Sequence, residues 1–186
     1  MTITSGVVTL YRQVNELMTE TRFLLHQVEQ QDPDLAAHLE RVGMYCFALG
    51  KYLKLPPHKL EQVYVVGLLH DIGLLPLGEM PLGEMSLRDV KRSELINILT
   101  FYMTWSSPVL RELSPIFSQQ GEQSALFTCI LNLANLYDEL RDLGLPWDLT
   151  IAQLQQNDEC VDHALITPFI QALEAEKLTE LLLEYQ

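Results

Sequence analysis

The sequence predicts an all-α protein, a helical bundle with about seven to nine helices. Apolar residues recur at spacings of three and four along most of the chain, and no alternating run of strand length stands out. Proline and glycine residues separate these segments. Because 48% of the 186 residues are hydrophobic, the chain can bury a substantial core. We expect a single domain over residues 1–186, with an N-terminal helix in residues 1–30 that packs on the core or precedes it.

The first half contains three predicted helices. The apolar stripe of residues 7–28 predicts the first, which ends before Asp32-Pro33. The second covers residues 35–53 and is closed by a pair of prolines. The third begins near Lys59 and is apolar nearly all round between residues 63 and 69. We therefore expect the third helix to lie in the centre of the bundle, with Gly73 ending it.

The second half begins with a tandem repeat, PLGEM-PLGEM, at residues 76–85. Two prolines and two glycines in this stretch predict a loop. Ser86, followed by Asp89, is typical of a helix start. A long helix is predicted over residues 123–142, before Gly144. The remaining predicted helices cover residues 95–102, 151–156, 162–173 and 175–184.

Charge and cysteine content exclude several classes of protein. The net charge is −13, and residues 76–186 hold 17 of the 25 acidic residues. This charge argues against a DNA partner, because binding to a phosphate backbone needs a cationic surface. No apolar run approaches the roughly 18 residues of a membrane span, and no secretory signal is visible. The three cysteines, Cys46, Cys129 and Cys160, are far apart and predict reduced thiols in a cytoplasmic protein.

One pair of residues stands out chemically, His70-Asp71 at the end of the most apolar helix. Adjacent residues on a helix point about 100° apart, so both can face one ion only where a helix ends or borders a cleft. Divalent metals accept such mixed nitrogen and carboxylate ligands. His38 lies one helix earlier on the apolar face and would approach the pair if the two helices pack side by side. We expect these three residues to share a cleft.

Other charged residues and histidines have simpler expected roles. Arg41 lies three residues after His38 and so shares its helix face. A buried arginine needs an acid, for which Asp71 and Asp138 are the candidates, and an ion pair between helices is favoured over substrate binding. His26 and His58 are expected on the surface, and His163 is expected near a helix start beside Asp162. Trp105 and Trp147, next to helix breaks, are expected to pack as lids.

Three segments together resemble the HD superfamily, and most closely its HD-GYP domains, with the related HDOD domains as second choice. Residues 31–43, QDPDLAAHLERVG, resemble the entry to an HD-GYP domain. Residues 60–75, LEQVYVVGLLHDIGLL, are similar to the helix that carries the His-Asp pair, and Leu-Leu-His-Asp-Ile-Gly is fairly specific for the superfamily. Residues 130–140, ILNLANLYDEL, resemble a later helix with two aspartates. The resemblance covers about two thirds of the chain and implies the helical HD fold.

Members of the HD-GYP family hydrolyse cyclic di-GMP at a centre of several metal ions. The resemblance carries His38, His70 and Asp71 over as metal ligands. Other family positions differ here: no histidine lies between residues 71 and 163, and no Gly-Tyr-Pro motif occurs. The late aspartate ligand falls at Asn135, a degenerate position because an amide is neutral, and the lysine that commonly follows the motif is Leu74.

Two functions compete. The favoured one is a degenerate HD-GYP-like domain in bacterial signalling, catalytically impaired, that acts by binding a protein partner or a nucleotide. The alternative is a metal-dependent HD phosphohydrolase for a cyclic nucleotide or another phosphate ester, with His38, His70, Asp71 and Asp138 holding one metal ion. The expected cofactor is one divalent metal (Mn, Fe, Ni or Mg) or none. A purely structural helical adaptor, the oligomeric state, and a cover over the cleft by residues 76–122 stay open.

Overall fold

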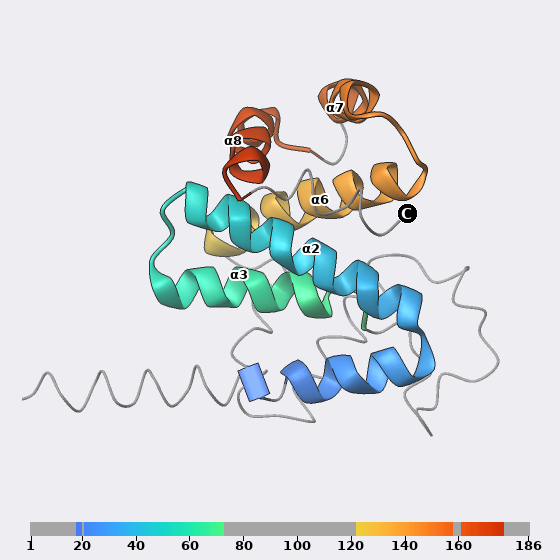
Figure 1. Cartoon of the computed structure of the whole chain (residues 1–186). Helices are drawn as coiled ribbons and strands as arrows, with labels where there is room; N and C mark the ends of the chain where they lie inside the picture. Colours follow the sequence, from blue (N-terminus) through green and yellow to red (C-terminus); the bar gives the residue numbers. More distant parts are fainter. Residues whose placement is uncertain (1–17, 20, 73–121, 158–160, 177–186) are drawn as a thin grey trace, which may run out of the picture.

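A computed structural model of the chain describes residues 18, 19, 21–72, 122–157 and 161–176, and all regular structure in these ranges is helical (Figure 1). This confirms the predicted all-α class. Residues 21–31 form a helical segment. The helices after it are α2 (Pro33–Tyr52), α3 (Pro57–Leu69), α6 (Glu122–Asp142), α7 (Trp147–Gln156) and α8 (His163–Ala175). None of the described helices is long and apolar enough to cross a membrane.

Several predictions fall on other parts of the chain. The predicted helix after Ser86, the loop of residues 76–85 and all of the predicted cover of residues 76–122 except Glu122 lie outside the described residues. So do Trp105, Cys160, the first part of the 7–28 stripe and nearly all of the 175–184 helix. The prediction of about seven to nine helices counted some of these segments.

The helix starts follow from local sequence. The Asp32 carboxylate accepts a hydrogen bond of 2.9 Å from the Leu35 amide, and Pro33 occupies the first turn of α2. Asp162 caps α8 by accepting from the Ala164 amide at 2.9 Å, and His163 is the first residue of this helix, near a helix start as expected. The predicted start of α7 at residue 151 is wrong, because the helix begins at Trp147 directly after Pro146. Trp147 is therefore part of a helix, and its ring packs edge-on against Tyr137.

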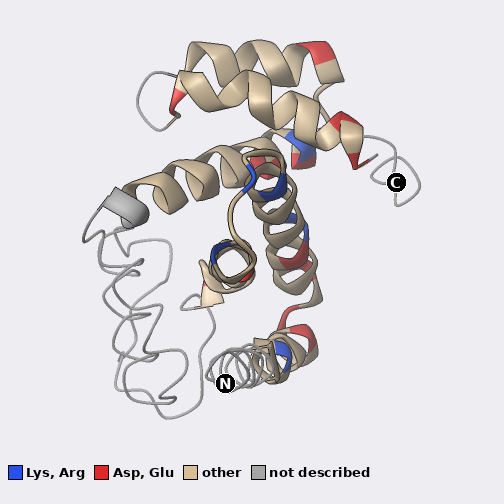
Figure 2. Ribbon diagram, turned by 90° about the vertical axis from the view of Figure 1, so that its left-hand side faces the viewer, with Lys and Arg blue, Asp and Glu red and all other residues tan. Residues whose placement is uncertain are grey.

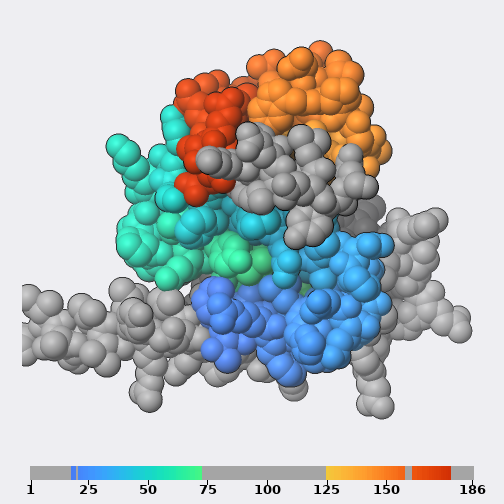
Figure 3. All heavy atoms as spheres, in the orientation of Figure 1, coloured from blue at the N-terminus to red at the C-terminus, as the bar shows by residue number. Residues whose placement is uncertain are grey.

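α2 is the central helix of the bundle, because it packs against α3, α6 and α8, whereas α3 packs chiefly against α2 and α6. The prediction that α3 lies in the centre is therefore wrong, although the second half of α3 is buried. In Figure 2, where α3 is seen almost end-on, α2, α6 and segment 21–31 lie on different sides of it. Figure 3 shows α7 and α8 at one end of the molecule and segment 21–31 at the other. Between α2, α6 and α8 the core is aromatic, with Tyr45, Tyr137 and Phe169 almost completely buried and packed edge-to-face.

Two glycines let α2 and α3 approach each other closely. A methyl group added to Gly67 would lie 2.7 Å from the Gly43 Cα atom, which belongs to the backbone of α2. A methyl group added to Gly43 would instead meet the Leu68 side chain at 2.7 Å. The contact matters for function, because α2 carries His38 and α3 ends at His70. The close approach at the two glycines therefore holds together the two helices that carry the imidazoles.

We expect Gly67→Ala to destabilise the protein by about 2 kcal/mol, and Gly43→Ala by clearly less. In the first variant a backbone must shift, whereas in the second a flexible leucine side chain can change rotamer. Urea unfolding of both variants, followed by circular dichroism at 222 nm, measures the two free energies of unfolding. Equal costs would contradict a backbone-to-backbone contact at Gly67.

Cys46 and Cys129 are free thiols, in line with the prediction. Cys46 lies in the core, and its burial raises the pKa of the thiol far above its ordinary value. The Cys46 thiol is therefore an inert core group and adds no ligand to the histidine pair.

Candidate metal centre

His70 stands at the point where α3 ends. It is the residue that caps α3 at its C-terminus, and it is 7% exposed. Its Nδ1 atom lies 2.8 Å from the carbonyl oxygen of Gly67, which can only accept. His70 therefore donates from Nδ1, and in the neutral ring Nε2 carries the lone pair. Because the helix ends here, the carboxylate of Asp71 also reaches Nε2, at 3.5 Å.

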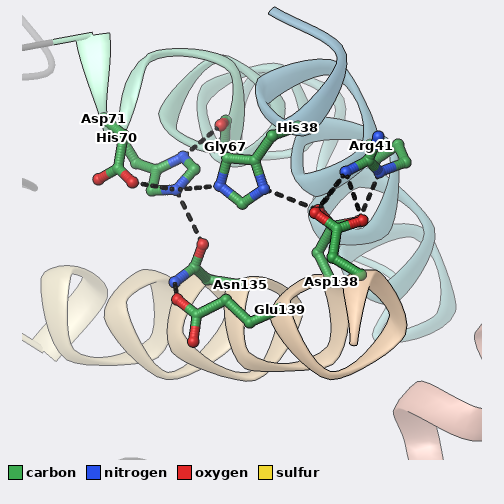
Figure 4. Close-up of polar contacts among 9 residues, drawn as sticks. His38, Arg41, Gly67, His70, Asp71, Asn135, Asp138 and Glu139 are labelled. Carbon is green, nitrogen blue, oxygen red and sulfur yellow. Dashed lines mark hydrogen bonds and ion pairs between the residues drawn. The ribbon is translucent and has the colours of Figure 1, made fainter. Parts of the chain in front are cut away.

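His38 reaches the same point from α2. Its Nε2 atom lies 3.3 Å from the Nε2 atom of His70, and the two rings are tilted by 58° (Figure 4). On the opposite edge of the ring, His38 Nδ1 donates to Asp138 at 2.7 Å. The neutral form of His38 therefore also carries its lone pair on Nε2. The two imidazoles face each other lone pair to lone pair.

Asp138, on α6, is the completely buried acid of the site. Arg41 donates from Nε and Nη2 to its two oxygens, each at 2.8 Å, in a bidentate ion pair. Arg41 Nη2 also contacts Asp142 at 3.1 Å, near the surface. Of the two acids considered for Arg41, the structure selects Asp138. The ion pair links α2 to α6 and fixes the acceptor of His38.

Asn135, one turn before Asp138 on α6, turns its carbonyl oxygen toward His70. The distance from Oδ1 to His70 Nε2 is 3.0 Å, and the amide nitrogen donates to Glu139 Oε1 at 2.6 Å. Asn135 is 6% exposed, whereas Glu139 is exposed. Figure 4 shows both side chains on α6, with the amide oxygen directed at the histidine pair.

The pKa values of the two histidines are shifted in opposite directions. Burial lowers the pKa of His70, and this outweighs the opposing charge of Asp71. Burial also acts to lower the pKa of His38, but the hydrogen bond to Asp138 and the charges of Asp138 and Asp71 raise it above its ordinary value. Asp138 would have a raised pKa from burial, but its hydrogen bonds to His38 and Arg41 hold the pKa below its ordinary value. Asp138 therefore stays ionised.

Four electron-pair donors thus converge on one point: His38 Nε2, His70 Nε2, Asp71 Oδ2 and Asn135 Oδ1. The donor atoms of His38, His70 and Asp71 all lie within 4.8 Å of one another. The separations of 3.0 and 3.3 Å match those of about 3.0–3.4 Å between neighbouring ligands held near 2.1 Å from one ion. Without a metal ion, the facing lone pairs of the neutral rings repel one another, and a proton on His38 Nε2 would relieve this repulsion by donating to His70 Nε2. The donor set therefore fits one divalent metal ion.

A second group, His38 with Asp138 and Asp142, has suitable spacing but the wrong environment. The guanidinium of Arg41 lies 2.8 Å from both oxygens of Asp138 and also contacts Asp142. A metal ion placed there would meet a fixed positive charge that already takes the carboxylate lone pairs. This group is an ion-pair network.

The structure brings together three of the four predicted ligands. His38, His70 and Asp71 meet, but Asp138 lies at Nδ1 of His38, on the edge of the ring that faces away from His70. Asp138 therefore acts as the carboxylate that accepts from the second ring nitrogen of His38 and fixes the orientation of the ring. His26 and His58 are exposed, as expected, and His163 is exposed as well.

Sequence reasoning missed two residues of the site. Glu139 drew no attention, although an asparagine and a glutamate four residues apart on a helix can form a hydrogen bond. Gly67 was not considered for the site, although its carbonyl accepts from Nδ1 and so sets the tautomer of His70. At the end of a helix, a histidine side chain can donate to the carbonyl oxygen three residues earlier, so the sequence alone could have pointed to Gly67 as the partner of His70.

No protein-family model, curated protein or solved structure matches this chain. The likeness to HD domains rests on the three sequence segments and stays a prediction.

Proposed function

We propose that this chain is a degenerate HD-GYP-like signalling domain that holds one divalent metal ion between α2, α3 and α6 and acts by binding a protein partner or a nucleotide. The observation that carries the proposal is the convergence of His38 Nε2, His70 Nε2 and Asp71 Oδ2 at the end of α3. Asn135 Oδ1 joins this group at 3.0 Å from His70.

The chemistry of the donor atoms limits which divalent metal ions suit the site. Two imidazole nitrogens suit Mn, Fe or Ni better than Mg, which prefers an all-oxygen shell. His38 is held from behind by Asp138, and His70 by the Gly67 carbonyl, so each ring has its Nε2 lone pair free for an ion. Such an ion would act as a Lewis acid toward a bound phosphate or carboxylate. The protein residues supply the orientation of the rings and shield the site within the bundle.

Impaired catalysis is supported by what surrounds the centre. The donors found in the described ranges suffice for one ion, and the chain has no histidine between residues 71 and 163 for a second. Arg41 is the basic side chain of this network, and Asp138 and Asp142 hold its Nε and Nη2 groups. A phosphate ester at the centre would therefore meet the carboxylates of Asp71 and Glu139, while the guanidinium of Arg41 stays paired with Asp138 and Asp142. Hydrolysis of an anionic substrate is disfavoured on this ground.

The second candidate function, a phosphohydrolase with one metal ion, is favoured by one observation. Asp71 is partly exposed, with 31% of its side chain accessible, so the centre is open to solvent on that side. An ion held by His38, His70 and Asp71 would keep positions for water and a substrate oxygen.

A hydrolysis assay separates the two functions. We expect the protein loaded with Mn²⁺ to release no product from cyclic di-GMP or p-nitrophenyl phosphate above the rate of free Mn²⁺. Product formation that depends on the protein and disappears in His70→Ala would contradict the proposal and establish the phosphohydrolase. Calorimetric titration of the same sample with cyclic di-GMP then tests nucleotide binding. A null result there leaves the protein partner as the proposed ligand.

A further inference from the structure

The Asn135–Glu139 pair occupies one face of α6 beside the histidine pair. Asn135 is the neutral member of the donor group, and its two amide ends make different contacts. The oxygen lies 3.0 Å from His70 Nε2, while the nitrogen donates to the Glu139 carboxylate at 2.6 Å. Glu139 contacts the centre only through Asn135 in the interactions that the described residues show.

The two ends of an amide have nearly the same shape and opposite chemistry. The carbonyl oxygen binds cations, whereas the NH₂ group carries positive partial charge and repels them. Beside a histidine lone pair, an unconstrained asparagine would turn its NH₂ group inward and donate to Nε2 of His70. A carboxylate on the other side reverses this preference, because it accepts only and forms a strong charge-assisted hydrogen bond with NH₂.

We infer that Glu139 is a positioning residue that makes Asn135 a ligand of the metal ion. It holds the NH₂ group away from the centre and so keeps the carbonyl oxygen directed at it. The hydrogen bond also polarises the amide, which increases the negative partial charge on the oxygen. Asn135 thus supplies an oxygen ligand and Glu139 supplies a negative charge behind it, as a single carboxylate ligand would. The carboxylate that would bind the ion directly is that of Asp71. This inference rests on the proposed metal centre.

Positioning and simple charge attraction predict different results for two variants. Glu139→Gln removes the charge but keeps a carbonyl oxygen that accepts from the Asn135 NH₂ group. Glu139→Ala removes both the charge and the acceptor. If Glu139 acts by positioning, Glu139→Gln retains most of the metal affinity and Glu139→Ala loses it. If it acts only through its charge, both variants lose the same amount.

The experiment is a calorimetric titration of the full chain with Co²⁺. We expect Glu139→Ala to bind about tenfold more weakly than the wild type, and Glu139→Gln less than about threefold more weakly. In an Asn135→Asp background, Glu139→Ala should cause no loss, because a carboxylate presents an oxygen in either orientation. The visible absorption of bound Co²⁺ should change in Glu139→Ala, since one oxygen ligand is lost, and stay unchanged in Glu139→Gln.

Controls keep the outcomes distinct. Glu174→Ala removes an exposed acid on α8, far along the chain from the centre, and should leave Co²⁺ binding unchanged. Equal losses in the two Glu139 variants, or the same loss in the Asn135→Asp background, would overturn the inference and leave the metal centre standing. A wild-type protein that binds no Co²⁺ would overturn the metal centre as well.

Discussion

Replacing Asp138 by alanine is expected to destabilise the folded protein by about 3–5 kcal/mol. The carboxylate is completely buried and accepts from Arg41 Nε, Arg41 Nη2 and His38 Nδ1. Its removal leaves Arg41 Nε and the His38 Nδ1–H group without an acceptor inside the bundle, while Arg41 Nη2 keeps its contact with Asp142 near the surface. The loss of an ion-pair partner in the interior costs more than the pair itself contributes, because the remaining charge stays desolvated.

Asp142→Ala is the matched control for this prediction. Asp142 lies on the same helix and contacts the same arginine, but 62% of its side chain is exposed, so we expect a cost below about 1 kcal/mol. Chemical unfolding at pH 7 measures both variants. Costs of similar size would contradict the view that Asp138 is the anchor between α2 and α6.

The Asp138 effect should also depend on pH in a defined direction. The pKa of Asp138 is lowered in the folded protein, so the unfolded state binds its proton first as the pH falls. The stability that Asp138 contributes is therefore complete above its ordinary pKa of 3.8 and is lost as the pH falls below that value toward the folded pKa. The difference between wild type and Asp138→Ala should shrink over this range.

His70→Ala is expected to weaken metal binding by more than about 100-fold, to a level that calorimetry no longer detects. The substitution removes the central donor, since His70 Nε2 is the atom that lies near His38, Asp71 and Asn135 alike. His38→Ala should act in the same direction. Circular dichroism spectra of both variants show whether the helices are kept.

His58→Ala serves as the control for the histidine variants. His58 is exposed in the first turn of α3, at the other end of the helix from His70, and we expect it to leave binding unchanged. An equal loss in His58→Ala would show that the metal binds at surface histidines. Retention of one tightly bound ion in both His70→Ala and His38→Ala would show that the ion lies elsewhere.

Much of the fold could be predicted from local rules. The spacing of apolar residues identified α2, α3 and α6, and prolines marked the starts of α2 and α3. The predicted start of a helix at residue 162 agrees with α8, which Asp162 caps. The start of α7 was missed because Trp147 was interpreted as a lid next to a helix break, although Trp147, Ile151 and Leu154 follow helical spacing. Pro146, which precedes the helix, was the better signal.

The centre was predicted in part, for a physical reason. Helical spacing shows which residues lie on the same face of a helix. The contact between His38 and the His70-Asp71 pair could therefore be predicted once α2 and α3 were assumed to be neighbours. The direction of a side chain depends on the helix that packs against it. The sequence therefore left open whether Arg41 pairs with Asp71 or Asp138, and placed Asp138 among the ligands although it lies behind the His38 ring. The amide orientation of Asn135 depends on Glu139, its neighbour four residues on along α6, and the sequence does not state which amide end faces His70.

The most direct test of the metal centre is an anomalous difference map from a crystal of the protein grown with Co²⁺. We predict one peak per chain, about 2.1 Å from Nε2 of His38 and of His70, with Asp71 and Asn135 oxygens beside it. A peak on the other side of His38, against Asp138 and Asp142, would contradict the account, as would the absence of any peak at the His70-Asp71 pair.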